Sequence, residues 1–240
     1  MLIKTRGIVL RVIKYGETSI ITDIYTEERG LQTYIINGVR TAKARIHPSL
    51  MQLGTMVSLV AHSRDNRSMN YVKEAQADYV YMSIPFQILK SSVALFMVEL
   101  IQKTVKEAES NPMLFQFLTD TFQYLDTMTE AVTNIHLCFM VQLSGHLGFQ
   151  PSSSDDTEAV YFDLQAGQFM CEDPLHQHSV SKEYAPLMKQ LIDTPITASH
   201  TLLLKGSERR YLLSKLVDYY RLHIENFQDL NSISVLQEVL

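Results

Sequence analysis

The sequence predicts an α+β fold, in which an N-terminal five-stranded β-barrel is followed by an α-helical C-terminal domain with a small irregular insertion. Two observations predict it. Up to about residue 80, short runs rich in β-branched and aromatic residues alternate with turns that contain glycine or asparagine. After Pro85, apolar residues recur every three to four positions, as in helices with one buried face. We expect one domain over residues 1–80 and a second over residues 81–240.

Short stretches of the N-terminal part have the features of β-strands. They are bounded by turn sequences such as Tyr15-Gly16-Glu17, Glu28-Arg29-Gly30 and Asn37-Gly38, in which glycine tolerates the backbone of a tight turn. Five strands at this spacing are typical of a small barrel, and the five-stranded OB barrel is one such fold. The expected strands are residues 7–14, 19–25, 31–36, 56–61 and 69–77.

Helical periodicity dominates the remainder of the chain. An apolar stripe begins at Phe86 and Leu89 and continues to Val105. Ser110-Asn111-Pro112 is typical of a helix start, because a capping side chain precedes a proline of the first turn. A third helix is expected from about Thr129 to Leu147, with Gly148 as its C-terminal cap. Later helices are expected at residues 181–193 and 207–227 and from Ser234, where Gln237 gives a capping-box spacing.

Charge is distributed unevenly between the two expected domains. Residues 1–80 carry eleven Lys or Arg against seven Asp or Glu, a net charge of +4, whereas residues 81–240 carry ten against nineteen, a net charge of −9. A basic β-module on an otherwise acidic chain indicates an anionic partner, and nucleic acid is the first candidate. Because the excess of basic residues is modest, we expect that contact to be weak or shared with another protein.

Several classes of protein are disfavoured by what the sequence lacks. No apolar run approaches the length of about 18 residues that a membrane span needs, and the N-terminus has no apolar signal core. Two cysteines offer no disulfide framework, which favours a cytoplasmic setting. No phosphate-binding glycine loop and no nucleophile motif occurs. We therefore expect no catalytic residues and no enzymatic activity.

The insertion, at about residues 149–180, breaks the helical pattern and contains a possible pair of strands near residues 160–164 and 168–171. Cys171, His176 and His178 lie close together within it. A structural zinc site needs four well-placed ligands, usually including paired cysteines. One cysteine with this spacing matches no common zinc motif, so we expect no metal and no cofactor.

Basic residues of the β-module form the one group of side chains that indicates a function. Some lie on or beside the first strand and the others in loops, and the interleaved Tyr15, Tyr25, Tyr34 and Tyr71 could stack on bases. Alternatively, the tyrosines fill the barrel and the basic residues are ordinary solvated surface; the pattern alone leaves both open. The candidate DNA-binding residues are Arg6, Arg11, Lys14, Arg40, Lys43, Arg45, Arg64 and Arg67.

An ordered set of short motifs runs along nearly the whole chain. The barrel motifs are Gly7-Ile8-Val9-Leu10, Tyr15-Gly16-Glu17-Thr18, Tyr25-Thr26-Glu27-Glu28-Arg29-Gly30 and Asn37-Gly38-Val39-Arg40. The helical part contributes residues 143–151 (LSGHLGFQP) and residues 232–236 (SISVL). Each motif is weak alone, but in this order the set resembles the RecO family of bacterial recombination-mediator DNA repair proteins.

The resemblance implies an N-terminal OB domain, a helical C-terminal domain and a nonenzymatic role in the bacterial cytoplasm, at the nucleoid. It implies binding of single- and double-stranded DNA, annealing of complementary strands, and action with RecR to load RecA onto DNA coated with single-stranded-DNA-binding protein (SSB). Many members carry a four-cysteine zinc module after the segment equivalent to residues 147–151. Here the equivalent stretch has only Cys171, so a degenerate module without zinc is expected.

The resemblance also implies a receptor for the acidic SSB tail, which ends in an apolar residue. Cations on one expected helix, beside Tyr211 and Leu212, are candidates, although a solvated face explains them equally well: Arg209, Arg210, Lys215 and Arg221. Two other functions stay open. One is a non-catalytic adaptor whose basic barrel is incidental. The other is a metal-dependent nuclease, which would need clustered carboxylates that the basic module lacks.

Overall fold

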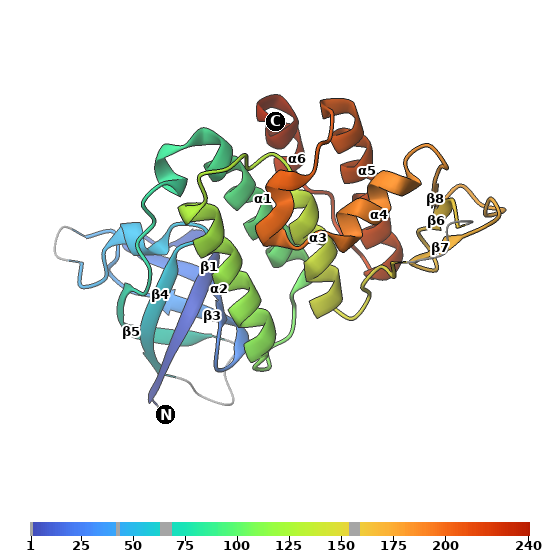
Figure 1. Ribbon diagram of the computed structural model, residues 1–240. Coiled ribbons are helices and arrows are strands. Elements are labelled where there is room, and N and C mark those ends of the chain that lie inside the picture. Colours follow the sequence, from blue (N-terminus) through green and yellow to red (C-terminus); the bar gives the residue numbers. More distant parts are fainter. Residues whose placement is uncertain (1, 42–43, 63–68, 154–158) are drawn as a thin grey trace. The chain divides into compact units, whose positions relative to one another are not determined.

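The computed structural model describes residues 2–41, 44–62, 69–153 and 159–240 (Figure 1). The chain forms two compact units, one made of residues up to 86 together with 98–126, the other of residues 87–97 together with 127–240. Helix α1 (Ile88–Thr104) spans the division. These units are spatial, whereas the expected boundary after residue 80 divides the chain in sequence order and stays a prediction. Within the described ranges, no helix is both long and apolar enough to cross a membrane.

The N-terminal strands close into a five-stranded barrel with the order β1-β2-β3-β5-β4. All five expected strands are present, so the predicted barrel is confirmed. The first is longer than expected, because residues 2–8 pair with β4 while residues 7–15 pair with β2. A parallel pairing of β3 with β5 closes the barrel. The strands are β1 (Leu2–Tyr15), β2 (Ser19–Thr26), β3 (Gly30–Ile36), β4 (Met56–His62) and β5 (Asn70–Ala77).

Alternate residues of the strands fill the barrel, as the period of two requires. Val9, Ile24, Tyr34, Val57 and Leu59 are among its fully or almost fully buried members. A β-bulge between residues 9 and 11 shifts the register of β1 against β2. The side chains beyond the bulge therefore face the opposite way from those that unbroken alternation would give.

Helix α2 (Pro112–Thr127) belongs to the same unit as the barrel and lies alongside it (Figure 1). It begins as predicted, because the Oδ1 atom of Asn111 accepts a hydrogen bond from the Leu114 amide at 3.0 Å. The hydroxyl of Ser110 donates to the carbonyl of Glu27 at 2.7 Å, and the ring of Phe115 packs 6.2 Å from that of Tyr25. These contacts fix the start of the helix to the β2–β3 hairpin.

Helices of the second unit surround α3 (Ile135–His146), whose residues 135–141 are all buried. The helix begins later than the predicted Thr129. Asn134, at its start, makes a tertiary bond: its side-chain Nδ2 donates to the Leu202 carbonyl at 2.8 Å. Gly148 follows the helix with φ +90°, as its predicted capping role requires. The other helices are α4 (Ala185–Asp193), α5 (Gly206–His223) and α6 (Ser232–Val239).

Two local predictions within the helical part are wrong. Phe86 and Leu89 were expected in a buried stripe but are 81% and 37% exposed. Phe86 ends a short 3-10 turn ahead of α1, so helical spacing counted from it does not apply. Helix α6 begins at Ser232 rather than Ser234, and the hydroxyl of Ser234 donates to the carbonyl of Asn231 at 2.9 Å instead of capping.

The insertion folds as a small three-stranded sheet in the order β7-β6-β8, which confirms the expected strand pair. Its strands are β6 (Tyr161–Asp163), β7 (Gln168–Met170) and β8 (Ser179–Val180). The buried ring of Phe162 packs edge-to-face on Phe169, with centroids 4.9 Å apart. The Oδ1 atom of Asp163 accepts from the Gln165 amide at 2.7 Å and holds the turn. Apolar packing and this turn therefore stabilise the sheet of the insertion; its equivalence to a degenerate zinc module stays a prediction.

Candidate nucleic-acid interface

Two of the expected DNA-binding residues are engaged within the barrel unit. Arg6 donates from Nε and Nη2 to the two carboxylate oxygens of Glu27, at 2.9 and 2.7 Å, and its guanidinium lies 5.3 Å from the centre of the Phe115 ring. Arg11 donates from Nε to Asp23 at 2.5 Å. The hydrogen bond from Arg6 holds the pKa of Glu27 below its ordinary value. A DNA phosphate would have to compete with these carboxylates, so DNA binding by either arginine stays a prediction.

Three other candidates are exposed and make no ion pair within the described ranges: Lys14, Arg40 and Arg45. The backbone explains why they gather. The Arg40 amide donates to the Thr18 carbonyl at 3.0 Å, and the hydroxyl of Ser19 donates to Asn37 at 3.2 Å.

These bonds place the segment after β3 beside the β1–β2 turn, which follows Lys14. Ahead of Arg45, the Thr41 amide donates to the Gly38 carbonyl and the Ala44 amide donates to the Thr41 carbonyl, each at 3.2 Å. One end of the barrel therefore carries cations that are available to a ligand; we call Lys14, Arg40 and Arg45 the cationic end.

The remaining candidates, Lys43, Arg64 and Arg67, lie outside the described residues, and their role stays a prediction. Lys4 is a further exposed cation of the barrel, which the sequence pattern does not indicate. This lysine is exposed on β1, opposite Val60 of β4, and it makes no ion pair with any residue that the structure describes. Its position on a strand beside apolar residues gave no signal that distinguishes it from other solvated lysines.

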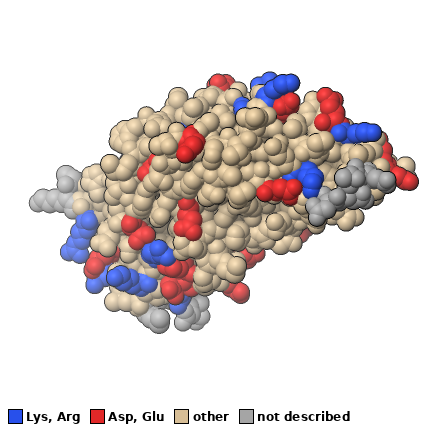
Figure 2. Space-filling model, viewed as in Figure 1, with Lys and Arg blue, Asp and Glu red and all other residues tan. Residues whose placement is uncertain are grey.

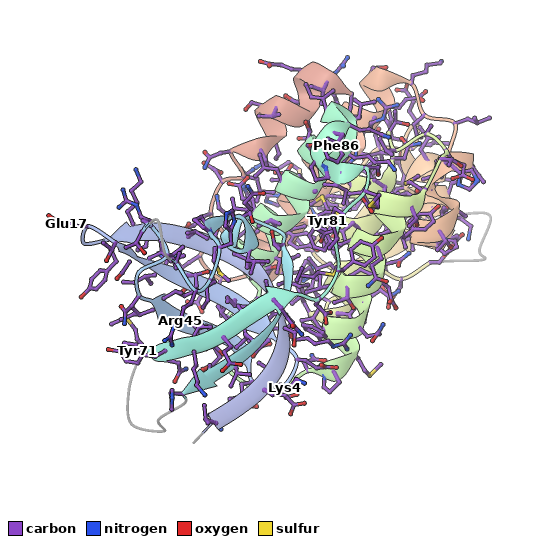
Figure 3. All side chains as sticks on the ribbon, turned by 90° about the vertical axis from the view of Figure 1, so that its left-hand side faces the viewer. Lys4, Glu17, Arg45, Tyr71, Tyr81 and Phe86 are labelled. Atoms are coloured by element: carbon purple, nitrogen blue, oxygen red, sulfur yellow. The ribbon has the colours of Figure 1, made fainter. Side chains whose placement is uncertain are left out.

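The four candidate tyrosines divide into two pairs. Tyr25 and Tyr34 are 1% and 4% exposed, and burial raises the pKa of each to about 12. They belong to the core, as the alternative interpretation expected. Tyr15 and Tyr71 are 51% and 38% exposed, so only these two could meet a base. Figure 3 shows Tyr71, Arg45 and Lys4 on the barrel and Glu17 at the tip of the β1–β2 hairpin.

On the face of the barrel seen in Figure 2, Lys and Arg side chains are interspersed with Asp and Glu and form no continuous basic patch. This agrees with the modest charge excess of residues 1–80. Electrostatic attraction alone would give weak binding that salt readily suppresses.

The four cations of α5 that were expected to bind the SSB tail differ from one another in their surroundings. Arg209 is half-buried and bonded to backbone and side-chain oxygens: Nε donates to Asn134 at 3.0 Å and Nη1 to the Leu240 carbonyl at 2.8 Å. Arg221 pairs with Asp218 and Asp229, at 3.1 and 2.7 Å.

Lys215 lies 5.6 Å from the centre of the Tyr211 ring. Arg210 is exposed and has no ion pair among the described side chains. It borders a small hollow together with Leu213, Leu236 and Leu240. Of the four expected cations, Arg210 is therefore the one best placed to meet an anionic partner.

The insertion holds no group that resembles a metal centre in the part of it that the structure describes. His176 lies 3.4 Å from Asp163, and Cys171 is exposed. Across all described residues, no three His, Cys, Asp or Glu side chains come together as metal ligands would. The expectation that the protein binds no metal stays a prediction.

The chain combines a barrel that has a cationic end with a helical part. Comparison with known families identifies the class of protein that has this arrangement. Residues 1–80 match the family model described as the N terminal part of recombination protein O, and residues 85–232 match the one described as its C terminal part. The chain belongs to the RecO family, and it has a role in DNA repair and recombination.

Relatives from several bacteria match the chain from end to end. A protein of Phocaeicola vulgatus named DNA repair protein RecO is 33% identical over 239 residues, covering 100% of this chain and 99% of its own. Proteins with the same name from Christiangramia forsetii and Bacteroides fragilis are each 34% identical over 240 residues, with the same coverage. The expected family and fold class are thus confirmed.

Proposed function

We propose that this protein is a non-catalytic recombination mediator. It binds single- and double-stranded DNA, anneals complementary strands, and helps RecR to load RecA onto SSB-coated DNA. The observation that supports this most directly is the cationic end of the barrel, where Lys14, Arg40 and Arg45 are exposed without ion pairs among the described residues. Membership of the RecO family supports the setting, DNA repair in the bacterial cytoplasm.

The mechanism that we propose is electrostatic. Annealing brings two polyanions together, and a surface that carries Lys and Arg reduces their repulsion by replacing condensed counterions. Few phosphate contacts suit a mediator, since it must release the strand after the hand-over. Annealing of SSB-coated complementary strands, measured with and without RecR, tests the whole proposal. If this protein leaves the annealing rate unchanged in both cases, the mediator function is wrong.

Two alternatives make different predictions. A metal-dependent nuclease would convert DNA to shorter products when Mg²⁺ is added, and it would need carboxylates grouped around the metal. The described residues include no group of three acidic or other ligand side chains, which argues against it. A structural adaptor with an incidental basic barrel would show no salt-dependent DNA binding.

We predict that replacing Lys14, Arg40 and Arg45 together by alanine weakens binding of single-stranded DNA of any sequence. The physical reason is the loss of up to three phosphate contacts. The slope of log affinity against log salt concentration should flatten by up to about two, since each contact to a single strand contributes about 0.7. Fluorescence anisotropy at several salt concentrations measures both effects.

A matched control removes the same charge elsewhere. Lys106, Lys182 and Lys205 are exposed and lie outside the barrel strands. Their joint replacement by alanine changes the net charge equally but should leave the salt slope unaltered. Equal weakening in both triple variants would mean that net charge, and not the cationic end, governs binding.

For the partner, we propose that the SSB tail docks beside the N-terminal part of α5, where its terminal apolar side chain packs over the hollow of about 10 Å³ lined by Leu213 and Leu236 and its acidic groups meet Arg210. Arg209 would contribute only by exchanging its bonds to Asn134 and Leu240.

We predict that Arg210→Glu weakens binding of an SSB-tail peptide by about tenfold, because it places like charges together at a docking site. Binding of DNA by the barrel should not change. Lys182→Glu, at an exposed lysine of the same unit, is the control with an equal change of charge. Peptide affinity, measured by calorimetry, should fall only in the first variant; equal affinities in both would exclude this receptor.

A further inference from the structure

The strand register aligns six residues in one continuous row around the outside of the barrel. Each member is the direct cross-strand partner of the next, and directly opposed side chains lie on the same face of a sheet. Across β1, β2, β3, β5, β4 and again β1, the outer row consists of Ile13, Ile21, Ile35, Tyr71, His62 and Leu2.

The neighbours of these residues show that the outer row faces away from the core. Ile20, Ile36 and Ala61 each precede or follow a member of the row, and all three belong to the interior cluster. By alternation, the adjacent side chains point outward. Leu2 is 52% exposed, Ile13 42% and Tyr71 38%, although all three are apolar or aromatic. Ile35 is 6% exposed and Ile21 is half-buried, so the open part of the outer row consists of Tyr71, His62, Leu2 and Ile13.

The next row of outward residues is different in kind. Arg11 lies opposite Asp23, which lies opposite Thr33, and these three are bonded to one another: Arg11 donates to Asp23 at 2.5 Å and Thr33 donates to it at 2.7 Å. The polar groups of that neighbouring row are thus hydrogen-bonded to one another. The outer row has no carboxylate and offers apolar surface and two rings, those of Tyr71 and His62.

Exposed cations lie at the β1–β2 end of the barrel, near Ile13. Lys14 follows Ile13 in β1 and is paired with Ile20, so its side chain leaves the opposite face of the strand from the outer row. The Arg40 amide donates to the Thr18 carbonyl, and its Nη1 donates to the Gly16 carbonyl at 3.5 Å. A nucleic-acid strand that runs along the outer row past Ile13 would meet these cations with its phosphates. Exposed rings together with exposed cations are the combination that recognises unpaired bases on a phosphate backbone.

We propose that the outer row is a stacking platform for single-stranded nucleic acid, on which Tyr71 and His62 contact base faces while Lys14, Arg40 and Arg45 contact phosphates. This inference rests on the proposed DNA binding and adds to it a basis for strand selection. A duplex conceals its base faces within the stack, so it can use the cations but not the rings. Stacking is tolerant of sequence, because every base has a flat face.

Tyr71→Ala tests the platform, with Tyr71→Phe as the matched variant that retains the ring. Affinity for a single-stranded oligothymidine should fall by about tenfold in the alanine variant and be retained in the phenylalanine variant. Affinity for a duplex of the same length should not change in either. The side chain is exposed and makes no hydrogen bond that would couple it to folding among the described residues, and circular dichroism verifies the fold.

A second measurement uses the unaltered protein. An oligonucleotide that carries 5-iododeoxyuridine forms photochemical cross-links to aromatic side chains in contact with the base, and mass spectrometry should place them at Tyr71 or His62. Cross-links elsewhere only, or equal loss of single-strand and duplex affinity in Tyr71→Ala, would overturn the platform. So would a variant that binds DNA normally but no longer binds RecR, which would make the outer row a protein interface.

The experiments distinguish a failure of the platform from a failure of the proposed function. If the unaltered protein binds no DNA, the proposed function and the platform are both wrong. If it binds DNA, and only the replacement of the cationic end weakens binding, the proposed function stands and the platform alone is wrong.

Discussion

Replacing Gly30 by alanine is expected to lower the free energy of unfolding by about 2–5 kcal/mol. Gly30 begins β3 with φ +59°, a left-handed conformation that costs a residue with a Cβ about 1–2 kcal/mol. A Cβ atom there would also come within 2.6 Å of the carbonyl oxygens of Glu107 and Glu109, in the segment that precedes α2. These are backbone atoms, so the segment itself would have to move, which adds the cost of overpacking. Urea denaturation followed by circular dichroism measures the loss.

Gly16→Ala is the control that separates the two causes. Gly16 has φ +58°, almost the value of Gly30, but a Cβ atom there would meet nothing within 4 Å. Its replacement should therefore cost only the backbone contribution of about 1–2 kcal/mol. If both variants lose the same stability, the close approach of the α2 segment to Gly30 has no energetic importance.

The two glycines also show what could be predicted from the sequence. A turn glycine between two β-rich runs is a local signal, and the turns at Gly16, Gly30 and Gly38 all have positive φ in the structure. The proximity of Gly30 to Glu107 arises because the Leu31 amide donates to the Glu107 carbonyl at 2.9 Å, a contact between distant parts of the sequence. No pattern within the β-module indicates that contact.

In the candidate site, too, features of the local sequence could be predicted, whereas contacts between distant residues could not. The basic character of the β-module could be counted, and exposure at Lys14, Arg40 and Arg45 follows from their place at strand ends and in turns. The pairing of Arg6 with Glu27 and of Arg11 with Asp23 depends on cross-strand register, which the β-bulge in β1 alters. Alternation alone could not identify which cations are neutralised by the barrel itself.

The outer row is a further case. Its members are drawn from five strands, and the pairings of β3 with β5, of β5 with β4 and of β4 with β1 are all needed to bring Ile35, Tyr71, His62 and Leu2 into one line. In the sequence these residues belong to unrelated runs, and His62 is simply the last residue of a strand. Such a surface becomes visible when the barrel is closed.

The carboxylate of Asp126, near the end of α2, holds the segment that leaves the barrel after β5. It is 3% exposed and accepts hydrogen bonds from the amides of Met82, Ser83 and Ile84 at 2.8–2.9 Å, and from the hydroxyl of Tyr79 at 3.2 Å. Burial alone would raise the pKa of Asp126, but the hydrogen bonds outweigh it and hold this pKa below its ordinary value.

Asp126→Asn is therefore expected to lower the free energy of unfolding by about 2–4 kcal/mol at pH 7. The amide group of asparagine has one acceptor and would direct its NH₂ group toward backbone donors that the carboxylate now satisfies. The exposed Asp120 of the same helix, which accepts one bond from Gln116 at 2.6 Å, provides the control. Asp120→Asn should change stability by less than about 0.5 kcal/mol.

The effect of Asp126→Asn should depend on pH with a definite sign. Because the folded-state pKa of Asp126 is lowered, its ionised form stabilises the fold fully above the unfolded-state pKa near 3.8, and this stabilisation is lost as pH falls through the folded-state value. The stability difference between the unaltered protein and the variant should thus be largest near neutral pH and shrink below about pH 4. Denaturation curves at pH 7, 5 and 3.5 measure it. A difference that stays constant over this range would show that the ionised carboxylate is not what holds residues 82–84, and that the shape of the side chain suffices.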